Sequence, residues 1–114
     1  MKKLLCIACL VFPGVALADG PWGDAPGCKR YLGQDTGSAD DLTLFDGNSI
    51  QNFESGCEIT ASESLGGDAY MLTTKCSGEG ETWMEKQKIK YSADNRSVTF
   101  YNDDGGQYVL KSCR

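Results

Sequence analysis

The stretch AYMLTTKCSGEGETWMEKQKIKY, residues 69–91, decides the fold. In its second half, residues 81–91, the apolar side chains Trp83, Ile89 and Tyr91 fall on one face, while a methionine and the lysines fall on the other. A period of two is typical of a half-buried β-strand and not of a helix. The stretch therefore predicts two strands joined by the turn SGEG.

Short apolar runs separated by turn residues continue on both sides of this hairpin. The clearest turn is NDDGG at residues 102–106, which predicts a second tight hairpin. No segment predicts a helix, and residues 19–27 (DGPWGDAPG) are expected to form an irregular arm in which Trp22 is packed. Strands of this length close into a barrel or a small sandwich, and we predict an all-β, small antiparallel β-barrel of seven to eight short strands. The expected strands are residues 42–45, 49–53, 57–61, 69–76, 81–91, 96–101 and 107–112, with polar loops at residues 33–41 and 62–68.

The first 18 residues carry the pattern of an export signal. Two lysines open the chain, an apolar stretch follows at residues 4–17, and Ala16-Leu17-Ala18 forms a cleavage site. The apolar stretch is too short to span a bilayer as a helix. We therefore predict a signal peptide over residues 1–18, cleaved after Ala18, and a single periplasmic domain over residues 19–114 with no membrane insertion.

The predicted mature domain keeps four cysteines, Cys28, Cys57, Cys76 and Cys113. An even number of cysteines in a small exported chain predicts two disulfides. Three pairings can be drawn, and we favour Cys57–Cys76 nested inside Cys28–Cys113, because the outer bond would tie the two ends of the domain together. A zinc site is not expected, because this domain has no CxxC pair and no histidine.

The charge of the predicted domain restricts its partners. Without the signal peptide, 9 basic and 16 acidic side chains remain, a net charge of −7. Such a surface is repelled by phosphate backbones and anionic headgroups, so nucleic acid and membrane surfaces are not expected partners. A cationic protein is attracted, although a net charge of this size also serves solubility alone.

Catalytic chemistry has few candidates in this chain. The absence of histidine removes the usual general base and metal ligand. Carboxylate pairs such as Glu79 with Glu81 can in principle cleave glycosidic bonds, but these lie in a turn without apolar surroundings. We therefore expect no enzyme, no metal and no cofactor, and look instead for binding loops. Two loops qualify, residues 62–68 before Tyr70 and residues 77–80 before Trp83, although both can be simple connections.

The chain resembles the membrane-bound and periplasmic inhibitors of c-type lysozyme, the MliC/PliC family. Family members are small exported antiparallel β-barrels with a disulfide from an early cysteine to one near the C-terminus, and Cys28 and Cys113 are placed to match. The inhibitory loop of the family reads S-x-S-G-x-x-Y and is followed by W-x-K-G. Here residues 62–70 read SESLGGDAY, with one or two extra residues before the tyrosine, and residues 83–86 read WMEK.

The resemblance implies that a loop blocks the active-site cleft of c-type lysozyme. By this analogy Ser64 and Lys86 reach the catalytic carboxylates of the enzyme, and Tyr70 and Trp83 support the loop. The implied partner-binding residues are Ser62, Ser64, Gly66, Gly67, Tyr70, Trp83 and Lys86. The alternative is a small exported envelope or host-interaction domain with a structural or binding role and no inhibitory activity.

Overall fold

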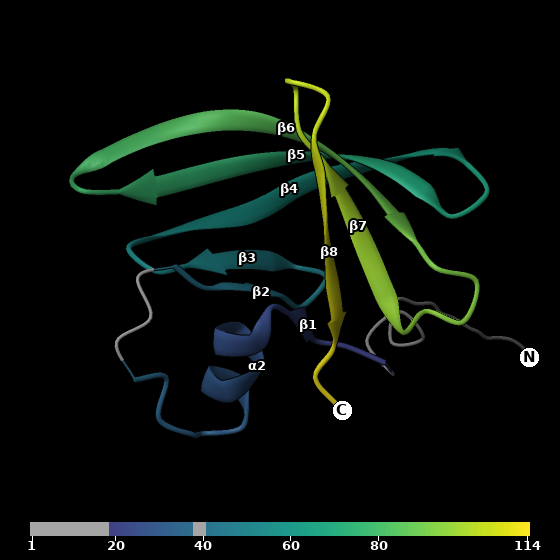
Figure 1. Cartoon of the computed structure of the whole chain (residues 1–114). Helices are drawn as coiled ribbons and strands as arrows, with labels where there is room; N and C mark the ends of the chain where they lie inside the picture. The colour runs from purple at the N-terminus through teal and green to yellow at the C-terminus, as the bar shows by residue number, and fades with distance from the viewer. Residues whose placement is uncertain (1–18, 38–40) are drawn as a thin grey trace, which may run out of the picture.

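The computed structural model describes residues 19–37 and 41–114, which form a closed antiparallel β-barrel with one short helix (Figure 1). The predicted signal peptide and residues 38–40 of the predicted polar loop lie outside the described residues. The elements in chain order are β1 (Trp22–Gly23), α2 (Ala25–Tyr31), β2 (Thr43–Phe45), β3 (Ser49–Asn52), β4 (Ser55–Gly66), β5 (Ala69–Gly78), β6 (Glu81–Tyr91), β7 (Ser97–Tyr101) and β8 (Gln107–Ser112).

Each strand pairs antiparallel with the next strand in the chain, and β1 closes the barrel. In the two-residue strand β1, Trp22 lies opposite Phe45 of β2 on one side and opposite Ser112 of β8 on the other. The predicted small antiparallel barrel is therefore confirmed. The strand predicted at residues 107–112 has the observed bounds, and the strand predicted at residues 81–91 does as well.

The core follows from the period-two pattern of the strands. Alternate residues of β5 point inward, so Leu72, Thr74 and Cys76 are buried, and Ile89 of β6 is buried opposite Tyr70. Aromatic rings fill the centre: Trp22 lies 5.6 Å from Phe45 and 5.3 Å from Tyr91, measured between ring centroids. The buried core cluster consists of Trp22, Phe45, Ile50, Leu72, Ile89, Val98, Phe100 and Leu110.

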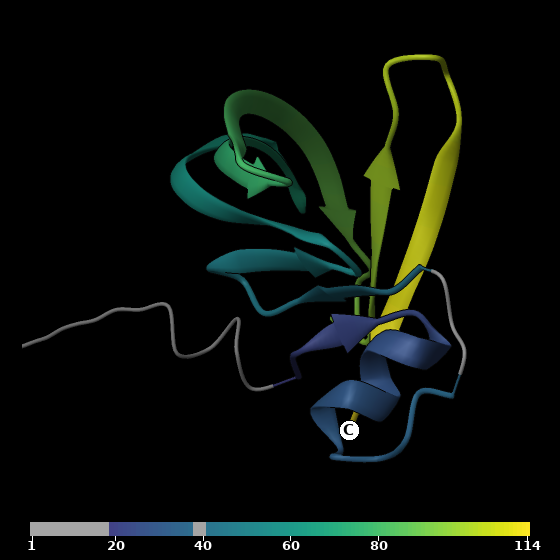
Figure 2. The same cartoon turned by 90° about the vertical axis from the view of Figure 1, so that its left-hand side faces the viewer.

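Strands β4, β5 and β6 are much longer than their neighbours and extend beyond the closed part of the barrel (Figure 1). The molecule is accordingly elongated, 53 × 30 × 28 Å. The β5–β6 hairpin curls away from the β7–β8 hairpin, as the end-on view of Figure 2 shows. Two hairpin ends, β4–β5 and β5–β6, therefore extend from opposite ends of one long sheet.

Two disulfides form in the predicted nested pattern. Cys28 of α2 bonds to Cys113, which follows β8, with a sequence separation of 85 residues. Cys57 of β4 bonds to Cys76, which lies directly opposite on β5. On the chain-entropy model, loops of these lengths stabilise the fold by about 4–5 and about 3 kcal/mol. A core built from fewer than 100 residues benefits from both.

The prediction that the chain has no helix is wrong at residues 25–31. Asp24 caps α2 by accepting a hydrogen bond from the Gly27 N–H at 2.8 Å, and a proline lies in the first turn. Seven residues are too few to show a helical apolar period, and so the pattern hid this helix. Gly27 is required here because a Cβ atom would lie 2.0 Å from the Thr43 carbonyl oxygen.

The expected irregular arm also contains strand β1. Trp22 is fully buried, and its indole N–H donates to the Asn95 carbonyl at 2.9 Å. A third difference concerns the loop predicted at residues 62–68, because β4 continues to Gly66. This half of β4 is exposed and has β5 as its only paired neighbour among the described strands, so its sequence has no buried face to mark it as a strand.

Candidate protein-binding site

The end of the β4–β5 hairpin contains five of the seven partner-binding residues expected from the sequence. Ser62 lies opposite Leu72, and Ser64 lies opposite Tyr70, so the two serines share the face of the sheet that carries the core. Gly66 ends β4 and Gly67 begins the turn, and residues 60–68 are exposed throughout. A polar surface with a narrow, glycine-containing end results.

Glycine is required in this turn. The φ angles of Gly66 and Gly67 are +104° and +58°, values that residues other than glycine rarely adopt. A β-bulge between Ser64 and Gly66 bends the strand just before the turn. The Gly66 N–H donates to the Ser64 hydroxyl at 3.3 Å, which holds the serine side chain against the last residue of β4, close to the turn.

Tyr70 joins this hairpin end to the core. Its ring meets the ring of Tyr91 edge-on at 5.9 Å, and Tyr70 packs partly buried against the core cluster. The Tyr91 N–H donates to the Asp68 carbonyl at 3.0 Å, which fixes the turn to β6. Burial raises the pKa of Tyr91 to about 12, and the neighbouring Tyr70 contributes to the rise. The hairpin end is thus held in place at its base and exposed to solvent at its tip.

The other two expected residues lie away from this hairpin end. Trp83 is opposite Cys76, six residues along β5 from Tyr70, or about 20 Å at the rise of a strand. Lys86 is opposite Thr73 and, as an even-numbered residue of β6, points to the outer face. The sheet therefore separates Ser64 and Lys86 onto opposite faces. The lysine nearest the turn is Lys90, which lies opposite Ala69.

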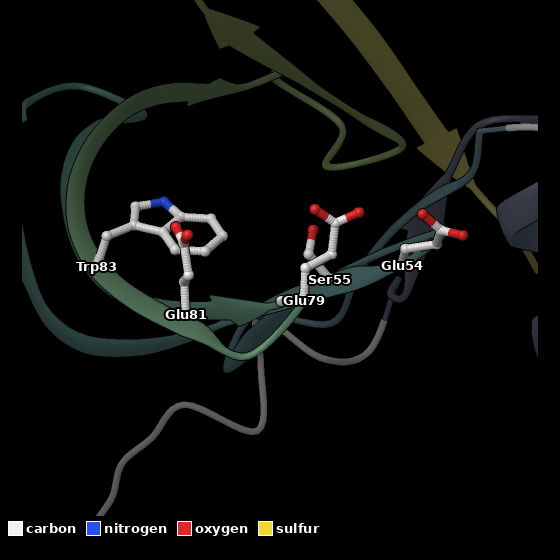
Figure 3. A pocket seen from close by; sticks show the side chains of 6 residues that line it. Glu54, Ser55, Glu79, Glu81 and Trp83 are labelled. Atoms are coloured by element: carbon white, nitrogen blue, oxygen red, sulfur yellow. The ribbon is translucent and has the colours of Figure 1, made fainter.

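Trp83 instead lies at the far end of the sheet, on the inner, concave side of β6 (Figure 3). It keeps 37% of its surface exposed, so it belongs to the open end of the barrel rather than to the core. Its indole N–H donates to the Glu85 carboxylate. A hollow of about 250 Å³ lies beside the ring and is lined by Glu54, Ser55, Gly78, Glu79, Glu81 and Trp83.

This acidic hollow was not predicted from the sequence. Its glutamates come from the β3–β4 turn, the β5–β6 turn and strand β6, so no local pattern joins them. Burial, together with the carboxylates of Asp24 and Glu85, raises the pKa of Tyr108. The one available signal was the density of glutamates around a tryptophan at residues 79–85.

No family model, curated protein or solved structure matches the chain. Within residues 19–37 and 41–114, no cluster of side chains is arranged to hold a metal ion. The same residues contain no helix long and apolar enough to cross a membrane.

Proposed function

We propose that this protein is an exported inhibitor of c-type lysozyme, and that the β4–β5 hairpin end enters and blocks the active-site cleft of the enzyme. The observation that carries the proposal is an exposed, polar, glycine-turned hairpin end anchored to the barrel core through Tyr70. A narrow end enters a cleft, and a rigid base lowers the entropy lost on binding. Such an inhibitor needs no catalytic group of its own.

Charge supports the same partner. C-type lysozymes are cationic, and a domain with a net charge of −7 is steered toward them. Steering of this kind raises the association rate, while contacts made after docking set the dissociation rate. The periplasm is also where an exported inhibitor would protect the bacterial cell wall.

The residues assigned to the proposed contact are Ser62, Ser64, Gly66, Gly67 and Tyr70. Ser64 supplies a hydroxyl close to the tip that can donate to a lysozyme carboxylate, and Tyr70 holds the base of the hairpin. The sequence resemblance implies that Lys86 is the cation that reaches the lysozyme carboxylates. Lys90 lies on the same outer face of β6 as Lys86. In the observed register it is closer to the turn, by four residues or about 13 Å along β6, so we assign the role to Lys90 on the basis of its distance from the turn.

Inhibition assays with alanine variants test the tip assignment. A hydrogen bond to a charged carboxylate contributes about 1.5–3 kcal/mol, so Ser64→Ala should weaken inhibition about 10-fold to 100-fold. Ser77→Ala is the matched control, because Ser77 is an exposed serine at the opposite end of β5. Both variants should keep the melting temperature of the parent, since neither side chain is buried.

Two lysine variants distinguish a partner contact at the hairpin end from a contact at the middle of the outer face of β6. Lys90→Ala should weaken inhibition, and Lys86→Ala should not. The reverse result would mean that the partner approaches the middle of β6, and it would contradict insertion of the hairpin end. Inhibition by Ser64→Ala equal to that of Ser77→Ala would also contradict it.

A further inference from the structure

Strand β6 has an open edge over residues 81–87. It pairs with β5 from Glu81 to Lys90, whereas β7 pairs only with residues Lys88–Tyr91. The side chains of residues 81–86 are exposed. Seven residues of free edge span about 23 Å, which is long enough to accept one further strand.

The backbone groups that face this edge can be identified. The Tyr91 N–H donates to the Asp68 carbonyl on the β5 side, and strand backbone groups alternate in direction, so the odd-numbered residues of β6 bond toward β5. The Cys57–Cys76 pair, with its Cα atoms 3.9 Å apart, has the close spacing of a non-hydrogen-bonded pair. Cys76 therefore bonds toward Trp83, in agreement with this pattern. Thr82, Met84 and Lys86 point their N–H and C=O groups outward.

The free edge of β6 lacks the bulges that commonly disrupt exposed edges. The free half of β4 contains register shifts between Ile59 and Ala61 and between Ser64 and Gly66. The pairing of β5 with β6 runs without a shift from Ala69 to Gly78. An unbroken exposed edge is a template on which another chain can form a strand.

The charges on the inner face of this edge indicate which kind of side chain an added strand would carry. Glu81, Trp83 and Glu85 alternate inward, next to the glutamates of the acidic hollow. Lysine or arginine side chains entering from an added strand would meet carboxylates and the exposed face of an indole. The outer face of the same edge presents Met84 and Lys86, and favours uncharged side chains.

We propose that the free edge of β6 binds an extended basic segment of a partner protein by antiparallel strand addition. Every second side chain of the segment is basic and points inward to Glu81, Trp83 and Glu85. The site lies at the end of the sheet away from Ser64, so it is an interaction surface additional to the proposed lysozyme contact. A second copy of this chain fits poorly, because it would bring another acidic hollow and another net charge of −7 against the first.

Titration of the purified domain with the capped peptide Lys-Thr-Lys-Val-Lys-Thr-Lys tests the proposal, with binding and amide hydrogen exchange followed by nuclear magnetic resonance. In an antiparallel addition with lysines inward, the threonine and valine N–H groups face β6. N-methylation of these three residues should abolish binding, whereas N-methylation of inner lysines should leave it within about twofold. Exchange should slow at the outward-facing amides of Thr82, Met84 and Lys86.

A variant of the protein gives a second readout. Met84→Pro removes one outward N–H without removing a bond to β5, and it should weaken peptide binding about fivefold or more. Met84→Ala keeps the N–H and is the control. The proposal would be overturned if both N-methylated peptides lost affinity equally, or if amide exchange did not slow at Thr82, Met84 and Lys86. Self-association of the domain in place of peptide binding would also overturn it. The lysozyme assay is independent, so either proposal can fail alone.

Discussion

The two tryptophans of the described residues offer a direct test of where the core ends. Trp22 is fully buried, contacts Phe45 and Tyr91, and closes the barrel through β1. Burying an aromatic ring removes about 200 Å² from water, which stabilises the fold by about 5 kcal/mol at 25 cal/mol per Å². Trp22→Ala also leaves a cavity and removes the hydrogen-bond donor of the Asn95 carbonyl, so we expect a loss of about 5 kcal/mol in the free energy of unfolding, at the upper end for such substitutions.

The matched substitution Trp83→Ala should cost less, about 3 kcal/mol, because only about two thirds of the Trp83 surface is removed from water. Trp83 also keeps 37% of its surface exposed at the open end of the barrel, where water fills the space left by the ring, so no cavity term is added. Urea denaturation followed by circular dichroism measures both changes, and the Trp83 variant should retain lysozyme inhibition. Equal losses for the two variants would refute the placement of Trp83 outside the core.

Three further results are expected. Stability should fall as the pH rises from 10 to 12, because the raised pKa of Tyr91 means that its neutral form is favoured in the folded state, and Tyr91→Phe should flatten this fall in an alkaline unfolding series. Replacing both cysteines of the outer disulfide with alanine should cost about 4–5 kcal/mol and the inner pair about 3 kcal/mol, and the reverse order in denaturant titrations would contradict the loop-entropy account. Gly66→Ala should weaken inhibition and lower the free energy of unfolding by about 1–3 kcal/mol through backbone strain. Gly56→Ala is the control: its added Cβ makes only an ordinary contact at 3.6 Å, so the free energy of unfolding should change by less than about 0.5 kcal/mol.

Strand periodicity predicted most of the barrel, because a half-buried strand needs one apolar face. The pattern succeeded for β6 and β8, whose bounds match the prediction. It failed for α2, which is stabilised by the Asp24 cap and the disulfide at Cys28 and is too short to show a period. It also failed for the outer half of β4, where exposure of both faces leaves the choice of residue nearly free of packing constraints.

The candidate site was predictable only in part. The polar, glycine-containing segment before Tyr70 was visible in the sequence, since turn residues and exposed serines are local features. The separation of Trp83 and Lys86 from that segment was not visible, because it depends on the register of β5 against β6. The acidic hollow likewise assembles glutamates from three separate elements.

Lysis of bacterial cells by c-type lysozyme, measured while the purified domain of residues 19–114 is titrated in, tests the central claim most directly. If the β4–β5 hairpin end inserts into the active-site cleft, as proposed, protection of the cells should saturate near one domain per lysozyme and should weaken with added salt. Ser64→Ala should require a higher concentration for the same protection. Undiminished lysis at a large molar excess of the folded domain would contradict the proposed function.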